Sequence, residues 1–295
     1  MRKASQTDGK FLKARWCGVN SDLCSVSPFG FTTTGAADFR GATADGRSFE
    51  NATFENVDFS YSNLTRARFI ACRFENCAFK NANLVRLYVK KCEYTDCDFS
   101  GADFRRALLG VFGTTMRRCV FDGVKTAECS PVNLIFENCS FQGRDWRRIR
   151  FWAAGFWNCS FVGDVDAVEF NGHGLLYPYI NWLGSPLRSG LHDVSFENAR
   201  LRFVGCKDGC TIENVQMPVD GSSFIGDVAG LVSLEGQLTS QPRLLDGIRE
   251  YFQVKHLKSQ TKQIVNRDDL EILNTPKLAD ELYELMRTRT AIRPS

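Results

Sequence analysis

The sequence predicts an all-β solenoid, in which short extended segments coil around one axis, followed by an α-helical tail. Three observations lead to this prediction. An apolar residue recurs at every fifth position from Phe39 to Leu109, residues twenty apart in this stretch are alike, and amphipathic helical patterns begin at residue 242. A period of five matches neither the 3.6-residue period of a helix nor the two-residue period of a strand.

Each five-residue unit places two residues inward. The central residues are mainly Phe and Leu, and the residues two positions before them are mostly small or apolar, with Arg47 the clear misfit. The other three positions are mainly polar, so each unit indicates a very short extended segment followed by a corner. Four such corners close a square coil of twenty residues, and successive coils stack as parallel strands about 4.8 Å apart.

Residues twenty apart should therefore share a face of the coil and form a column in its core. The first column is all Phe, and the other three are aromatic or aliphatic apart from one Ala. In order, the columns are Phe39, Phe59, Phe79 and Phe99; Ala44, Leu64, Leu84 and Phe104; Phe49, Phe69, Val89 and Leu109; and Phe54, Phe74 and Tyr94. Stacked columns of this kind form the core of a β-solenoid.

The repeat continues beyond residue 110 with a change of phase. The phase moves by two residues within 110–115, and a second run has its central residues from Phe121 to Phe161. Two residues of this run, Pro131 and Arg144, fit their inward positions poorly. We therefore expect a bulge or an excursion at each of them.

The pattern is lost over residues 162–190, which we interpret as an irregular insertion. A weaker third run starts at Leu191, and the spacing between Phe161 and Phe196 equals seven five-residue units. The coil is therefore expected to continue beneath the insertion and to end near residue 225. The insertion contains four candidate binding residues, His173, Tyr177, Tyr179 and Trp182. Loops on rigid scaffolds often carry function, but a packed excursion that fills a groove explains the segment equally well.

The five-residue units resemble the Ala-(Asp/Asn)-(Leu/Phe)-X-X unit of the pentapeptide repeat proteins. Clear examples are 37–41, 82–86 and 102–106, which read Ala-Asp-Phe-Arg-Gly, Ala-Asn-Leu-Val-Arg and Ala-Asp-Phe-Arg-Arg. The resemblance is strong over residues 37–161 and weak over 189–217. It implies a right-handed quadrilateral β-helix, so we assign the β-helix to residues 36–225.

The tail at 226–295 is expected to be helical. Residues 242–265 carry apolar residues among charged ones, as in one amphipathic helix. A second helix is predicted to start at Pro276, with Thr275 as its N-cap, and its apolar stripe is Leu278, Leu282 and Leu285. This tail can cover the open end of the solenoid or pair with a second copy, and we expect both capping and a homodimer. Residues 1–35 are expected to cap the other end.

The composition indicates a soluble cytoplasmic protein. The 295 residues carry a net charge of +3, and 43% of them are hydrophobic, which is ordinary for a globular chain. We find neither a long apolar run for a membrane span nor the apolar core of a signal peptide. Nucleotide-binding and hydrolase motifs are also missing, so we expect neither an enzyme nor a cofactor.

The twelve cysteines raise the alternatives of a metal or disulfide ladder and a structural role. The pairs Cys72/Cys92 and Cys77/Cys97 are twenty apart, and Cys119, Cys139 and Cys159 form a third set, all at the small inward position. The sequence has no Cys-x-x-Cys motif, and the three histidines lie outside the regular repeats, so zinc-site spacing is missing. We expect buried structural thiols and no metal.

The arginines suggest a binding surface. Arg66, Arg86 and Arg106 are twenty apart and should project from one corner. We expect Arg105, Arg117 and Arg118 to extend this patch. A second cluster contains Arg147 and Arg148 among aromatic residues. One interpretation is a site for an anionic partner, and the other, which we favour at this point, is a solvated face.

We expect a non-catalytic scaffold or adaptor that presents its β-helical surface to a protein partner. The family resemblance adds an alternative, because some pentapeptide repeat proteins mimic DNA, bind type II topoisomerases such as gyrase and protect them from poisons. Such mimics are strongly acidic, whereas residues 36–161 contain 18 Lys and Arg against 14 Asp and Glu, and Ala78 interrupts the column Asp38, Asp58 and Asp98. Direct binding of nucleic acid is the least favoured hypothesis.

Overall fold

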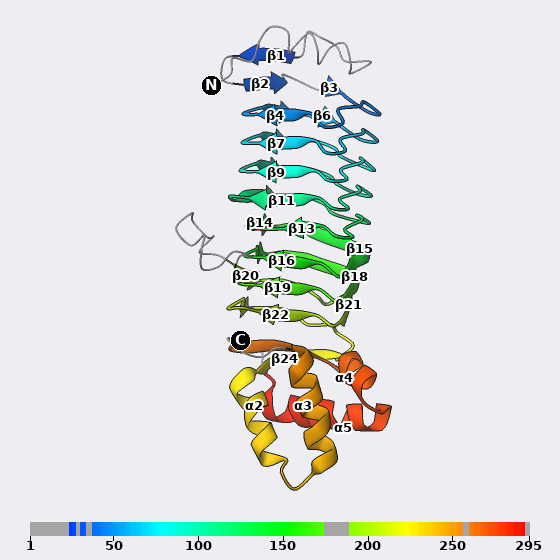
Figure 1. Ribbon diagram of the computed structural model, residues 1–295, viewed down its shortest axis with the longest axis vertical. Coiled ribbons are helices and arrows are strands. Elements are labelled where there is room, and N and C mark those ends of the chain that lie inside the picture. The colour runs from blue at the N-terminus through cyan, green and yellow to red at the C-terminus, as the bar shows by residue number, and fades with distance from the viewer. Residues whose placement is uncertain (1–23, 28–29, 34–36, 174–188, 256–259, 293–295) are drawn as a thin grey trace.

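The chain forms a column of stacked β-coils that ends in a helical domain (Figure 1). The computed structural model describes residues 24–27, 30–33, 37–173, 189–255 and 260–292. The fold is a β-solenoid of about eight turns with a C-terminal helical region, as the period of five predicts. Neighbouring coils pair in parallel, and we number the four faces of the coil I to IV in chain order.

Each face carries one short strand per coil, and on several coils faces I and II carry only an isolated bridge. Face I contains β3 (Ala37–Asp38), β6 (Val57–Asp58) and the first parts of β15 (Ser140–Arg147) and β18 (Ser160–Asp166). Face II contains the second parts of β15 and β18, followed by β21 (Ala199–Arg202). Face III contains β4 (Ser48–Glu50), β7 (Arg68–Ile70), β9 (Tyr88–Lys90), β11 (Leu108–Val111), β13 (Ser130–Pro131), β16 (Arg150–Trp152), β19 (Glu169–Asn171) and β22 (Gly205–Lys207).

Face IV is the longest sheet and reaches the N-terminal end. It contains β1 (Cys24–Ser27), β2 (Gly30–Thr33), β5 (Thr53–Glu55), β8 (Arg73–Glu75), β10 (Glu93–Thr95), β12 (Thr114–Arg117), β14 (Leu134–Glu137), β17 (Gly155–Trp157), β20 (Gly190–His192) and β23 (Thr211–Glu213). The strands β1 and β2 are antiparallel, and β2 pairs with β5 in parallel. The rest of the expected N-terminal cap lies outside the described residues.

The core consists of the predicted columns. On face I the rings of Phe79 and Phe99 stack at 4.9 Å, and those of Phe99 and Phe121 at 5.1 Å. Rings of adjacent columns meet edge to face, as Phe74 and Phe79 do at 5.6 Å. Offset-stacked and edge-to-face pairs are the favourable aromatic geometries, so each ring stabilises the coil above, the coil below and the neighbouring face.

The predicted phase change is a longer coil with a β-bulge. Tyr94 pairs with Met116, 22 residues further on, and the register of β9 with β11 shifts between Leu108 and Val111. The bulge expected at Pro131 is wrong, because Leu109 pairs regularly with Pro131. Pro131 needs no bulge since the N–H groups beside it, on Ser130 and Val132, donate to the preceding coil.

The register also shifts between Gly143 and Trp146, which confirms the irregularity expected at Arg144. After this shift the coil is one residue shorter on face II, so the buried Val165 follows Phe161 by four positions. This shortening disguises the repeat, and the insertion predicted at 162–190 therefore starts too early. Residues 162–171 belong to β18 and β19 of the coil.

The coil continues past the excursion, as expected. Phe156 pairs with Leu191 and Ser160 bridges Ser195, so β17 and β20 are adjacent although thirty-five residues separate them. The excursion leaves face III after Asn171 and returns to face IV at Gly190. Residues 174–188, which include Tyr177, Tyr179 and Trp182, lie outside the described residues.

The described residues of the C-terminal region form four helices and one antiparallel strand pair. The strands are β24 (Ser223–Asp227) and β25 (Lys262–Asn266), and the helices are α2 (Val228–Gln237), α3 (Pro242–Lys255), α4 (Arg267–Leu273) and α5 (Pro276–Thr290). The helix predicted over 242–265 is too long, since α3 ends at Lys255 and Ile264 lies in β25. The helix predicted from Pro276 is confirmed with Thr275 as its N-cap, although the Thr275 side chain makes no capping hydrogen bond.

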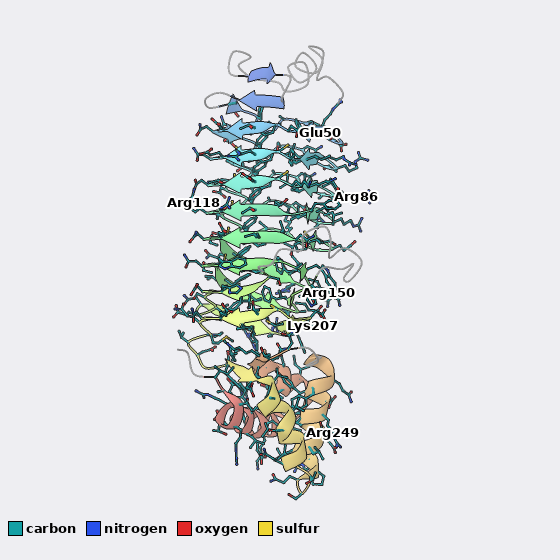
Figure 2. All side chains as sticks on the ribbon, turned by 90° about the vertical axis from the view of Figure 1, so that its left-hand side faces the viewer. Glu50, Arg86, Arg118, Arg150, Lys207 and Arg249 are labelled. Atoms are coloured by element: carbon teal, nitrogen blue, oxygen red, sulfur yellow. The ribbon has the colours of Figure 1, made fainter. Side chains whose placement is uncertain are left out.

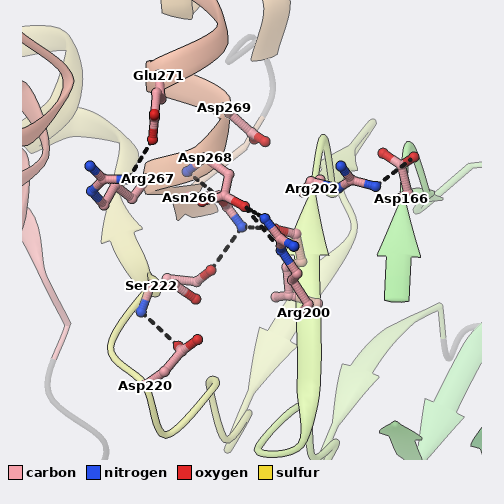
Figure 3. Close-up of polar contacts among 12 residues, drawn as sticks. Asp166, Arg200, Arg202, Asp220, Ser222, Asn266, Arg267, Asp268, Asp269 and Glu271 are labelled. Atoms are coloured by element: carbon pink, nitrogen blue, oxygen red, sulfur yellow. Dashed lines mark hydrogen bonds and ion pairs between the residues drawn. The ribbon is translucent and has the colours of Figure 1, made fainter. Parts of the chain in front are cut away.

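The strand β25 covers the last coil through its side chains. The Gln263 amide accepts from the Cys206 N–H and donates to the Cys206 carbonyl, both at 3.0 Å. The Asn266 amide donates to the Leu201 carbonyl, and the Asp269 carboxylate accepts from the Phe203 N–H at 2.6 Å. Arg200 and Asp268 add an ion pair at the edge (Figure 3). These groups satisfy coil backbone that a further coil would otherwise pair.

The apolar stripe of α5 packs inside the same chain. Leu282 is fully buried, and Leu278 and Leu285 are partly buried against the same cluster of helix side chains. This packing agrees with the capping role expected for the tail. Because the stripe is occupied within the chain, it offers little area for a second copy, and homodimerisation stays a prediction.

Candidate macromolecule-binding surface

The predicted arginine column is a corner of the coil between faces II and III. Arg66, Arg86 and Arg106 have left-handed backbone angles, with φ of 56°, 58° and 60°. Each donates its N–H to a carbonyl of the next coil, and Arg148 does the same with φ of 53°. The fold therefore places Arg148 in the column of the three predicted arginines, with Glu128 between Arg106 and Arg148.

Only part of this corner is neutralised. Arg66 pairs with Asp45 at 2.7 Å and Arg106 pairs with Glu128 at 3.0 Å. The hydrogen bond from Arg66 holds the pKa of the Asp45 carboxyl below its usual value. Arg86 and Arg148 are exposed, and neither makes an ion pair with any described residue. Ion pairs between exposed side chains contribute little stability, so the paired arginines of this corner remain available to an anionic partner, as the unpaired ones do.

The expected extension of the corner to Arg117 and Arg118 is wrong. Arg118 lies at the corner between faces IV and I, on the opposite edge of the column from Arg86 (Figure 2). It pairs there with Asp96 at 2.6 Å, and Arg117 on face IV pairs with Glu137 at 2.7 Å. Twelve residues after Arg106, the chain has turned two further corners.

Arg105 and Arg147 lie on face II, beside the corner. Arg105 forms an ion pair with Asp103 at 2.7 Å, which neutralises it. Arg147 approaches Asp164 only at 4.0 Å. Of the second predicted cluster, Arg148 therefore belongs to the corner and Arg147 to the adjoining face.

Sequence reasoning missed an apolar strip on face III. Ile70, Tyr88, Leu108 and Phe112 occupy outward positions that are polar in most units, and Leu108 and Phe112 are 37% and 40% exposed. The available signal was the spacing itself, because Tyr88 and Leu108 are twenty apart at an outward position. Exposed apolar side chains that gather in one place mark a candidate interaction site.

The acidic column on face I is neutralised. Arg40 pairs with Asp38 at 2.7 Å and approaches Asp58 at 3.8 Å, and Lys80 pairs with Asp98 at 2.9 Å. The hydrogen bond from Arg40 lowers the pKa of Asp38 to about 2. Face I thus carries alternating charges and not an anionic stripe.

A histidine cluster lies at the end of the excursion. His192 stacks on Trp157 at 4.7 Å, and its ring nitrogens lie 2.9 Å from the Glu213 carboxylate and 3.1 Å from the Thr211 hydroxyl. The Thr211 hydroxyl donates to the Ser189 carbonyl at 2.9 Å. Its proton is therefore directed away from His192, which argues for a structural clamp and against an activated nucleophile. The predicted His173 is exposed and lies near Gly209.

Ten cysteines of the described chain are free and buried. The longer coil aligns the separate sets into one column of five, which is Cys77, Cys97, Cys119, Cys139 and Cys159. Their Sγ atoms donate to nearby carbonyls, as Cys139 does to Met116 at 3.3 Å. Burial raises the pKa of Cys129 to about 12. Within the described residues, no group of three His, Cys, Asp or Glu side chains is placed to hold a metal ion.

We expect thiol reagents to modify none of these ten cysteines in the native chain. A thiol must be accessible to react, and the fold encloses all ten of these side chains. Labelling with iodoacetamide, followed by peptide mass spectrometry, should place any native-state label on Cys17 or Cys24 alone. Denatured protein, in which all twelve should react, is the control, and native labelling of Cys139 would contradict the expectation.

The described part of the core contains a cavity that is too small for an organic ligand. A cavity of about 20 Å³ lies in the core beside Thr126 and Pro131, where smaller residues replace Phe or Leu, and apolar side chains line it. It is about large enough for one water molecule. None of the described helices has the length and apolar character needed to cross a membrane.

The square coils, with two inward residues in each unit of five, define a quadrilateral β-helix. Residues 34–73 and 72–110 match two models of pentapeptide repeats, so this part of the β-helix consists of pentapeptide repeats. No curated protein matches it at a significant level.

Three solved structures show a limited similarity to this chain. QnrB1, a plasmid-mediated fluoroquinolone resistance protein, is 19% identical over 57% of this chain and 78% of its own, with a TM-score of 0.28. HetL from Nostoc sp. strain PCC 7120, involved in heterocyst differentiation regulation, is 11% identical over 57% of this chain and 86% of its own, with a TM-score of 0.22. A pentapeptide repeat protein of the Arabidopsis thaliana thylakoid lumen is 18% identical over 49% and 75%, with a TM-score of 0.17. At these values the likeness concerns the fold alone.

Proposed function

We propose that the chain is a non-catalytic scaffold that binds a protein partner through the outer faces of its β-helix. The observation that carries this proposal is the contrast between a filled core and an outer surface with unneutralised cations beside exposed apolar side chains. A rigid column fixes these groups at the coil spacing, so little ordering entropy is lost on binding. The ten buried free thiols agree with a reducing compartment, and we propose the cytoplasm.

A DNA mimic that protects a type II topoisomerase is the alternative, and the charges oppose it. Mimicry of a phosphate backbone requires an anionic surface, whereas Asp38, Asp58 and Asp98 are paired with cations. Addition of the purified chain to a gyrase supercoiling assay with a quinolone tests this alternative. We expect no protection, and full protection would replace our proposal.

Capture of partners from a lysate tests the scaffold proposal. The immobilised full chain is compared with a variant lacking 173–188, after nuclease treatment and at two salt concentrations. This deletion leaves Leu191 five positions after Phe170, the normal spacing, so the coil should still close. We expect one protein to be retained in stoichiometric amount by the wild-type chain. Retention of nothing above a bare-resin control argues against the proposal, and a partner lost with the deletion assigns specificity to the excursion.

A further inference from the structure

Three consecutive coils on face III combine exposed or half-buried apolar side chains with cationic ones. We call this surface the β7–β9–β11 patch. Its apolar members are Ile70, Tyr88, Leu108, Val111 and Phe112, and its cations are Arg66, Arg68, Arg86, Lys90, Lys91 and Arg106. Arg86, which is labelled in Figure 2, lies at the corner that borders the patch.

The β-bulge of the long coil exposes Phe112. The register shift places Val111 opposite Lys90, and Gly110 allows the bulge with φ of 86°, where a Cβ would lie 2.3 Å from the Val132 carbonyl oxygen. Phe112 then follows in the left-handed region with φ of 63° while 40% exposed. Corner residues throughout the coil share this conformation, as Lys91 does with φ of 53°, so the corner that follows the bulge directs the Phe112 side chain outward.

The two rings of the patch are covered by cations. The Arg68 guanidinium lies 4.8 Å from the centre of the Tyr88 ring, and the Lys90 ammonium lies 4.7 Å from the centre of the Phe112 ring. These contacts fix the rings and hold positive charge directly above apolar surface. The solvent-facing side of the patch is therefore both apolar and positively charged.

The positive charge of the patch is mostly uncompensated. Arg68, Arg86, Lys90 and Lys91 make no ion pair with any residue that the structure describes. Acidic groups occur only at its borders, where Asp45 pairs with Arg66, Glu128 pairs with Arg106, and Glu50 lies opposite Ile70. A partner that covers the patch must supply carboxylates around an apolar contact.

We propose that the β7–β9–β11 patch binds an acidic amphipathic α-helix of a protein partner. This proposal rests on the scaffold function and specifies its surface. One turn of a helix rises about 5.4 Å and one coil about 4.8 Å, so three turns laid along the column drift from the coils by about 2 Å. Apolar residues at i, i+3 and i+4 would contact Leu108 and Phe112, and flanking glutamates would meet Arg86 and Lys91.

Nucleic acid fits the same patch less well. Aromatic residues bind single strands by stacking on bases, but Arg68 and Lys90 occupy faces of Tyr88 and Phe112. A phosphate backbone running along the corner would also meet the exposed Glu128 carboxylate. Leu108 and Val111 would gain nothing from phosphates.

Fluorescence anisotropy with the full chain tests the proposal. The probe is a labelled synthetic helix with a leucine stripe flanked by glutamates, and the controls are a scrambled peptide and a single-stranded DNA. We expect Phe112→Asn to weaken peptide binding about thirtyfold, since an aromatic anchor is lost, and Arg86→Glu about tenfold. Arg118→Glu, at the opposite corner, should change binding by less than about twofold.

Stability measurements separate binding from folding. Asn tolerates the left-handed region, so Phe112→Asn should leave the free energy of unfolding unchanged or slightly higher while binding falls. Equal affinity of the scrambled peptide, no binding of the helix peptide, or tighter binding of the DNA with a steep salt dependence would each overturn the proposal. If the Phe112→Asn and Arg86→Glu variants both still retain the lysate partner, the proposed role of the patch is wrong and the scaffold function stands. Capture of no partner would count against the scaffold function itself.

Discussion

Replacement of Phe74 by alanine is expected to lower the free energy of unfolding by about 3–5 kcal/mol, the usual loss for a buried phenylalanine. Phe74 is fully buried, and its ring stacks on Phe54 at 4.9 Å and on Tyr94 at 4.6 Å. The cavity would remain open, because the neighbouring rings are fixed by backbone pairing of their own coils. Guanidinium denaturation followed by circular dichroism measures the loss.

A substitution on the same strand gives the control. Glu75 follows Phe74 and is exposed, so Glu75→Ala should change stability by less than about 0.5 kcal/mol. In a solenoid each coil contacts only its neighbours, and Phe74→Ala should also make the N-terminal coils open before the rest. A loss below about 1 kcal/mol for Phe74→Ala would mean that the core relaxes around the gap.

The coil was predictable because its determinants are local and repeated. A residue such as Phe59 contacts residues one coil away, and a fixed coil length converts this long-range contact into a constant sequence spacing. The same logic found the long coil, since two extra residues shift every later central position, as from Phe99 to Phe121. It failed at 162–171, where the loss of one residue on face II hid two further strands.

The C-terminal cap was predictable only in part. Helix α5 has its own apolar stripe and starts at Pro276, so its sequence alone is enough to predict the helix. The sequence of β25 is not enough to predict a strand, because its conformation depends on the partner strand β24 and on the last coil, both distant in sequence. Its residues Gln263 and Asn266 are polar, yet fully buried, since they pair with coil backbone instead of water.

The surface was predictable to the extent that it follows the period. The corner arginines emerged from a spacing of twenty, and Arg148 joins them only once the longer coil is known. The β7–β9–β11 patch depends on the bulge at Gly110, which turns Phe112 outward. No periodic pattern encodes the direction of a residue inside a bulge.

Replacement of the capping glutamine tests whether the tail seals the solenoid. In Gln263→Leu the Cys206 N–H and carbonyl lose their partners in a buried site, and each unpaired group costs about 1–3 kcal/mol. We expect the free energy of unfolding to fall by about 2–4 kcal/mol, within the range that follows from two such groups. Guanidinium denaturation measures this loss, with Gln237→Leu, an exposed glutamine at the end of α2, as the matched control.

The same variant should also associate. Once β25 separates from the last coil, β22 presents unpaired backbone, and such an edge pairs readily with another chain. Light scattering should then show a mass that rises with concentration for Gln263→Leu and not for Gln237→Leu. A variant that loses stability but stays unchanged in mass would mean that α4, through Asp269 and the Phe203 N–H, holds the edge closed without Gln263.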